Sequence, residues 1–160
     1  MQGYFPNPTS KELILKNKAM FDFEKLDVYQ VVKEQNNKVL VFLNENHGID
    51  EMLLKSWKEA SLAIVLNLAQ GTGRKNPNEK KHFLTLARGF VFESATILQI
   101  VHDFNLIDEF KYQEFYDGYE KASKMLLGMF RSYTRRDGER DYNKDLSEKE
   151  FTETESDFGL

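Results

Sequence analysis

Apolar side chains recur at intervals of three, four and seven residues through most of this chain, which is the spacing of one face of an α-helix. The pattern predicts four long helices, over about residues 23–46, 50–69, 76–105 and 108–136. No stretch shows the competing alternation of apolar and polar residues that is typical of a strand. Short connections join the helices, so the pattern predicts an all-α fold, an up-down-up-down antiparallel four-helix bundle.

Each predicted helix has one stripe of core-facing positions, and polar Asn36 falls within the first stripe. In chain order the stripes are Leu26, Tyr29, Val32, Val39 and Leu43; Leu53, Trp57, Ala60, Ile64 and Asn67; Phe83, Ala87, Phe90, Ser94, Ile97 and Val101; and Tyr112, Phe115, Tyr119, Ala122, Leu126, Met129 and Tyr133.

The helix ends carry their own signals. Gly71 follows the second stripe, where a glycine with positive φ commonly ends a helix. Asn76 and Pro77 suit the N-cap and first position of the third helix, Asn105 ends it, and Asp108 suits the N-cap of the fourth. These signals explain the glycines of the loop. An anion site at the third helix's N-terminus is the alternative, but the loop lacks a nucleotide-binding motif.

The middle two helices are apolar on almost every side. Residues 60–69 contain no charge, and residues 89–101 contain one, Glu93. A helix that is apolar all round is buried all round, and neither run reaches the roughly 20 residues of a membrane span. We therefore expect no membrane partner but a homo-oligomer, with a generous monomer core as the alternative. The interface residues that we predict are Leu62, Val65, Leu66 and Phe92.

Composition and charge divide the chain into three parts. With 160 residues and no cysteine, we expect one domain without disulfides, and the N-terminus lacks a signal-peptide pattern, which predicts a cytoplasmic protein. Residues 1–22 form an extension, residues 23–136 the bundle, and residues 137–160 an acidic tail. The tail holds nine acidic and three basic residues, and this composition predicts disorder.

No pattern indicates catalysis, a cofactor or a metal. A di-iron bundle needs two Glu-x-x-His pairs and two further glutamates, whereas this chain has one such spacing, Glu79 to His82, at the start of a helix. Three scattered histidines do not predict a catalytic triad. We expect a protein that is not an enzyme and holds neither cofactor nor metal.

Alternating helix directions would gather basic residues at one end of the bundle. Such an end could contact phosphates, although Glu24, Asp27 and Glu79 dilute it. The alternative is that the arginines of the fourth helix only complement its dipole. The possible nucleic-acid contacts are Lys25, Arg74, Lys75, Lys80, Lys81, Arg131, Arg135 and Arg136.

Two polar residues fall at positions that we expect to be buried. Asn67 lies in the stripe of the second helix, where it would need partners and could set the register of the bundle. Glu93 is the lone charge of its apolar run. Antiparallel pairing places Glu93 within about one helical turn of Lys58, so we predict a Lys58–Glu93 ion pair.

Three blocks of sequence resemble one known family. The segments are Phe23–Tyr29 (FEKLDVY), Asn67–Arg74 (NLAQGTGR) and Phe83–Gly89 (FLTLARG) with Glu93. They are similar to four-helix-bundle proteins encoded in 23S ribosomal-RNA intervening sequences, over about residues 23–133. The sequence departs from the family pattern at Lys58 and Glu59, where relatives usually have arginines. Further departures are Ala63-Ile64-Val65 in place of Ser-Ile-Pro, and Gln70 in place of glutamate.

The resemblance implies a homo-oligomer, pentameric in relatives, without enzymatic activity. A more distant likeness, to the accessory protein of diversity-generating retroelements, implies nucleic-acid binding. Our expectation from the sequence is a homo-oligomeric bundle that binds RNA or a ribonucleoprotein partner at its basic end. The alternative is a protein–protein scaffold that makes no contact with nucleic acid.

Overall fold

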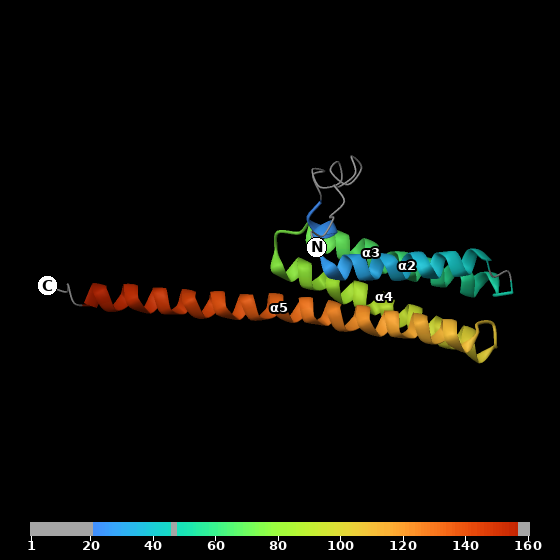
Figure 1. Cartoon of the computed structure of the whole chain (residues 1–160). Helices are drawn as coiled ribbons and strands as arrows, with labels where there is room; N and C mark the ends of the chain where they lie inside the picture. Colours follow the sequence, from blue (N-terminus) through green and yellow to red (C-terminus); the bar gives the residue numbers. More distant parts are fainter. Residues whose placement is uncertain (1–20, 46–47, 157–160) are drawn as a thin grey trace, which may run out of the picture.

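The computed structural model describes residues 21–45 and 48–156, and side chains as far as residue 136. A short 3₁₀ helix, η1 (Asp22–Lys25), precedes four α-helices: α2 (Asp27–Glu45), α3 (Glu51–Thr72), α4 (Pro77–Asp103) and α5 (Glu109–Ser156) (Figure 1). The predicted first helix therefore begins later than expected, with η1 in front of it. Residues 1–20 of the predicted N-terminal extension lie outside the described residues.

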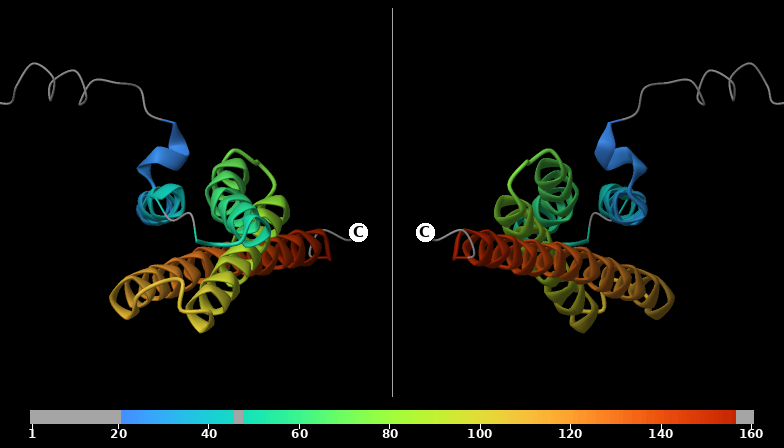
Figure 2. Two further views of the ribbon diagram at one scale, coloured as in Figure 1. Left: turned by 90° about the vertical axis from the view of Figure 1, so that its right-hand side faces the viewer. Right: turned by 90° about the vertical axis from the view of Figure 1, so that its left-hand side faces the viewer.

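The four α-helices form a ring in the order α2, α3, α4, α5, and each contacts its two neighbours (Figures 1 and 2). Consecutive helices run in opposite directions, so the predicted up-down-up-down four-helix bundle is confirmed. The α3–α4 hairpin makes the most extensive contact, and α2 packs less closely on its two neighbours.

Side-chain caps begin the helices where the sequence predicts them. Asp50 Oδ1 accepts a hydrogen bond from the Met52 amide at 2.9 Å, Asn76 Oδ1 accepts from Asn78 N at 2.8 Å, and Asp108 Oδ1 accepts from Lys111 N at 2.9 Å. Asn105, the second residue after α4, has a φ of 56°, a left-handed conformation that asparagine tolerates. These caps satisfy amides that have no partner within the helix.

The centre of the bundle is aromatic. Trp57 of α3 makes edge-to-face contacts with Phe42 of α2 and Phe115 of α5, at centroid distances of 6.1 and 6.2 Å. Most predicted core positions are buried or packed against the core. In α4, however, Leu84 and Val91 are buried, whereas the predicted Phe83 and Phe90 beside them are half-buried, and of these two Phe90 packs against the core.

Gly71 has a different role from the predicted one. It lies inside α3, which continues to Thr72, and no described glycine has a positive φ. A Cβ atom on Gly71 would lie 2.7 Å from Cβ of Phe83, which is closer than packed atoms allow. The absence of a side chain at residue 71 therefore lets α3 and α4 approach each other beside their connection.

The fourth helix does not end near residue 136. The backbone of α5 continues as one helix to Ser156 and extends beyond the other three helices (Figure 1). This differs from the predicted disordered tail. The segment contains no proline and many Glu, Lys and Arg residues, which have high helix propensity, so local preference favours helix where the lack of apolar residues had suggested disorder.

Among the described helices, α4 is apolar enough and long enough to cross a membrane, judged by length and composition alone. The apolar run that we identified in this helix, residues 89–101, is shorter than the 18-residue window that passes this test. A central bundle helix passes the same test, and α4 packs between α3 and α5.

Candidate nucleic-acid interface

The bundle brings the predicted basic residues to one end. The α3–α4 loop, the start of α4, η1 and the part of α5 near residue 133 lie at this end (Figure 1). We call it the basic end, and it holds Lys25, Arg74, Lys75, Lys80, Lys81, Arg131, Arg135 and Arg136. Four carboxylates lie in η1, at the start of α2 and at the start of α4: Asp22, Glu24, Asp27 and Glu79.

The α3–α4 loop holds Arg74 in a defined position. The Arg74 amide donates a hydrogen bond to the Gly71 carbonyl at 3.1 Å. Its guanidinium lies over the Phe83 ring, 4.8 Å from the centroid, a favourable arrangement for a cation on an aromatic face. Arg74 is nevertheless exposed, so it is both ordered and accessible to a ligand.

Other basic residues at this end differ in how freely they can contact a ligand. Lys80 Nζ lies 5.4 Å from the centroid of the Tyr133 ring, which joins the start of α4 to α5. Lys25 Nζ is 3.0 Å from the Asp22 carboxylate, which offsets its charge. Lys75, Arg131, Arg135 and Arg136 are exposed, and Lys81 is half-buried.

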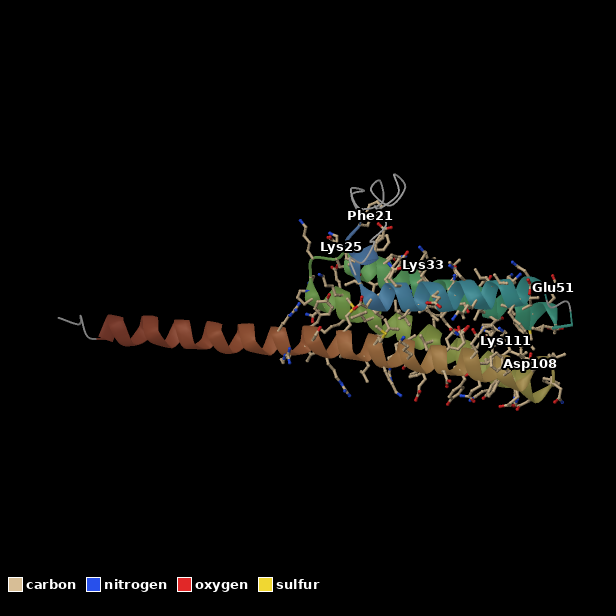
Figure 3. All side chains as sticks on the ribbon, viewed as in Figure 1. Phe21, Lys25, Lys33, Glu51, Asp108 and Lys111 are labelled. Atoms are coloured by element: carbon tan, nitrogen blue, oxygen red, sulfur yellow. The ribbon has the colours of Figure 1, made fainter. Side chains whose placement is uncertain are left out.

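The opposite end of the bundle is acidic. Figure 3 labels Glu51 and Asp108 there, far from Lys25. The same helix turns at this end contain three basic residues, Lys55, His102 and Lys111. They also carry six carboxylates: Glu45, Asp50, Glu51, Asp103, Asp108 and Glu109. His102 Nε2 lies 2.9 Å from Glu109 Oε2. The bundle therefore has opposite charge at its two ends.

An aromatic surface at the basic end was not predicted from the sequence. The rings of Phe21 and Phe23 are stacked, with centroids 5.5 Å apart and planes within 6° of each other. Phe23 meets Tyr29 edge to face at 4.9 Å, and Lys33 Nζ lies 5.9 Å from the Tyr29 centroid. The spacing of Phe21, Phe23 and Tyr29 around Lys25 is the sequence signal that could have indicated it.

The predicted buried polar residues are not placed as expected. Asn67 is half-buried, and its amide donates to the Ala63 carbonyl of its own helix at 2.8 Å, so it cannot set register between helices. Glu93 is exposed on α4, and Lys58 Nζ instead donates to Asn44 Oδ1 at 2.8 Å. The predicted Lys58–Glu93 pair was wrong, because Glu93 lies outside the buried face of its helix.

The predicted interface residues divide into three groups. Val65 is only 9% exposed and belongs to the monomer core. Leu62 and Leu66, 46% and 48% exposed, lie on the outer face of α3. Phe92 lies on the α5 side of α4, beneath the guanidinium of Arg88 at 4.6 Å. Arg88 in turn donates to Ser123 of α5 at 3.1 Å. The two exposed leucines therefore form a surface separate from Phe92.

A polar group lies in the centre of the core. The Tyr119 hydroxyl accepts a hydrogen bond from Trp57 Nε1 at 2.8 Å and lies 3.1 Å from Ser61 Oγ. Burial raises the pKa of the Tyr119 phenol above its ordinary value, against the opposing effect of its hydrogen bonds with Ser61 and Trp57. Because α3 and α5 are diagonal in the ring, these bonds link helices that do not touch through their backbones.

The described residues do not group their histidines and carboxylates into a metal site. His82 and His102 lie near opposite ends of α4, and His47 is outside the described range. Within residues 21–45 and 48–136, no three His, Asp or Glu side chains are grouped as metal ligands. The chemistry that this geometry offers is recognition through charge and stacking.

Comparison with protein families identifies the family of the chain. Residues 24–128 match the model of the 23S rRNA-intervening sequence protein family. The chain belongs to this family. The resemblance in the three sequence blocks is thereby confirmed, and the match covers η1 to the middle of α5.

A solved member of the S23 ribosomal protein family supports the fold. The chain is similar to a Bacteroides thetaiotaomicron protein of unknown function from that family, with a TM-score of 0.62 and 13% identity. The similarity covers 64% of this chain and 97% of the other. At this identity it establishes a shared fold and no shared activity. No curated protein matches the chain.

In this 23S rRNA-intervening sequence protein, the block Asn67–Arg74 has the arginine of the family pattern, and Arg74 lies at the basic end. Lys58 and Glu59, where the resemblance leads us to expect arginines, lie on α3, and Lys58 is bonded to α2. Any nucleic-acid contact of this member should therefore centre on the loop rather than on residues 58 and 59.

Proposed function

We propose that the protein is a non-enzymatic, homo-oligomeric bundle that binds RNA through its basic end. The observation that supports this proposal best is the charge difference between the two ends of the bundle. Up to residue 136, eight basic residues and four carboxylates lie at the basic end, whereas carboxylates predominate at the other end. An RNA strand approaching this bundle is attracted to one end and repelled by the other.

The basic end suits phosphate contacts better than a single buried ligand. Arg74, Lys75 and Arg131 are exposed and come from two different elements. Exposed cations contact the nucleic-acid backbone without reading its sequence, and each contact releases counterions. The family is named after an intervening sequence of 23S rRNA. This association is the reason that we propose RNA as the nucleic acid.

The proposal can be tested by measuring binding of a labelled oligoribonucleotide by fluorescence anisotropy over a range of salt concentrations. The test variant combines Arg74→Gln with Lys75→Gln. The matched control combines Lys55→Gln with Lys121→Gln, which removes the same charge from exposed sites outside the basic end. We expect the test variant to bind more weakly and to reduce the salt slope by about 0.7 for each lost contact.

Equal weakening by the two double variants would contradict a localised interface, because it would attribute binding to net charge alone. Absence of binding by the unmodified chain at low salt would contradict RNA binding altogether. Circular dichroism spectra of both variants would show that the helices are retained.

The alternative function is a protein–protein scaffold without nucleic acid. The exposed Leu62 and Leu66 on α3 and Leu86 on α4 favour it, because apolar side chains on neighbouring helices form a surface for protein association. Salt distinguishes the two functions. Phosphate contacts weaken steeply as salt is added, whereas apolar association does not.

A further inference from the structure

An exposed phenylalanine ring, Phe21, stacks on half-buried Phe23 at the basic end. Phe21 stacks on Phe23 and is nevertheless 70% exposed. In Figure 3 Phe21 lies beside Lys25 at the η1 end of α2, and Lys33 lies farther along α2. Phe21 adds little to the core in this position, so its exposed ring is available to a ligand.

Local structure holds the rings in place. The Phe21 amide donates to the Glu24 carboxylate at 2.8 Å, and Gln30 Nε2 donates to the Glu24 carbonyl at 2.8 Å. Phe23 packs edge to face on Tyr29 of α2, and η1 contacts both α2 and α3. The Phe21 ring is therefore presented in a fixed direction, which reduces the ordering cost of binding.

We infer that Phe21 and Phe23 form a stacking surface for an unpaired base, so that the ligand of the basic end is single-stranded RNA. This inference rests on the proposed function and identifies the form of RNA that is bound. An aromatic ring beside cations is the arrangement with which proteins hold single strands, because every base has a face that can stack.

The carboxylates of η1 are engaged locally, Asp22 with Lys25 and Glu24 with the Phe21 amide, and the cations beyond them favour a nucleic acid over an apolar protein segment. Lys33 lies over the Tyr29 ring, Lys25 is paired with Asp22, and η1 packs on α3, the helix that leads into the loop with Arg74. A strand stacked on Phe21 would therefore have Lys33 of α2 and Arg74 of the α3–α4 loop as cations for its phosphates. Bases within a duplex already stack on each other and cannot reach the ring, so this surface selects single strands.

The first experiment compares Phe21→Ala with Phe104→Ala. Phe104 is 69% exposed at the acidic end and serves as the matched control. Anisotropy titrations use a labelled single-stranded oligoribonucleotide and the duplex that it forms with its complement. Loss of one stacked base should weaken single-strand binding about 5- to 150-fold. The salt slope should not change, because no phosphate contact is removed.

The second experiment observes stacking directly. The chain has one tryptophan, Trp57, and it is fully buried. Phe21→Trp adds an exposed indole at the aromatic surface, and Phe104→Trp adds one at the acidic end. We expect the single strand to quench the emission of the Phe21→Trp variant, whereas the duplex leaves it unchanged. The Phe104→Trp variant should respond to neither.

The outcomes separate this inference from the proposed function. The stacking surface would be overturned, with RNA binding intact, by three results together. Both RNA forms would bind equally, Phe21→Ala would not weaken binding, and RNA would not quench Phe21→Trp. Weakened binding by Phe104→Ala to the same degree would also overturn it. If the unmodified chain binds neither form at low salt, both the inference and the proposed function fail.

Discussion

At the scale of single residues, Gly71 controls how closely α3 and α4 approach. Gly71→Ala should be less stable than Gly89→Ala by about 1–3 kcal/mol. Alanine gains about 1 kcal/mol over glycine in a helix interior, which applies to Gly89 in α4 and only in part to Gly71, the last but one residue of α3. Only Gly71→Ala introduces a clash, because a Cβ on Gly71 meets Phe83 at 2.7 Å, whereas a Cβ on Gly89 has no neighbour within 4 Å.

The measurement is urea denaturation followed by circular dichroism, with Gly89→Ala as the control for helix propensity. Equal free energies of unfolding for the two variants would show that the α3–α4 contact adapts to the additional methyl group. The close approach would then not depend on glycine at residue 71.

Tyr119 makes the stability of the core sensitive to alkaline pH. Tyr119→Phe leaves Trp57 Nε1 and Ser61 Oγ without their shared partner, so we expect a loss of about 1–3 kcal/mol at neutral pH. Burial raises the pKa of the Tyr119 phenol in the folded chain. Below about pH 10 the phenol is neutral in both states, and its contribution to stability is complete.

Above about pH 10 the phenol ionises in the unfolded chain before it does so in the folded chain, so its contribution is lost as the pH rises. The difference in unfolding free energy between the original chain and Tyr119→Phe should therefore narrow between pH 7 and pH 11. Urea denaturation at several pH values measures it, and comparison of the two chains cancels the titration of other groups. A constant difference would contradict the prediction.

At the scale of helices, the repeat of apolar residues was sufficient to predict four helices, their directions and most core positions. The repeat did not predict the positions of residues whose burial depends on how a neighbouring helix packs. Glu93 was expected to be buried because its neighbours in sequence are apolar, but it lies on the exposed side of α4. Gly71 resembled a helix end, and only the position of Phe83 shows that it lies at a helix contact.

The exposed face of α3 provides a test of self-association. The double substitution Leu62→Glu with Leu66→Glu should reduce the mass in solution, because it places carboxylates on the apolar surface that we propose as an interface. The matched control, Val41→Glu with Met52→Glu, adds the same charge at two other exposed apolar sites. Light scattering measures the mass of all three chains. Loss of assembly in both variants would locate the interface elsewhere.

At the scale of the whole molecule, the charge difference between the two ends arises from topology. Lys25, Arg74 and Arg131 are far apart in sequence, so the sequence could predict their meeting only through the alternation of helix directions. The aromatic surface at Phe21 could not be predicted in this way. Its geometry depends on η1, a short turn that interrupts the expected helix before α2.

The extension of α5 should weaken RNA binding. Residues 137–160 carry nine acidic and three basic residues, and α5 enters this segment at the basic end (Figure 1). A chain that ends at Arg136 should bind single-stranded RNA about two- to tenfold more tightly at low salt, because a local negative charge is removed. The gain should shrink at 0.15 M salt, where screening acts over about 8 Å.

Two controls separate charge from the loss of a helical segment. A full-length chain with the nine acidic residues of this segment changed to Asn or Gln should reproduce the gain of the shortened chain. Thermal unfolding should be nearly the same in all three, since Tyr133 is the last residue described as packing on the core. If only the shortened chain binds more tightly, the segment obstructs the basic end by its bulk. If neither variant gains affinity at low salt, the extension projects too far from the bound strand for its charge to act on it.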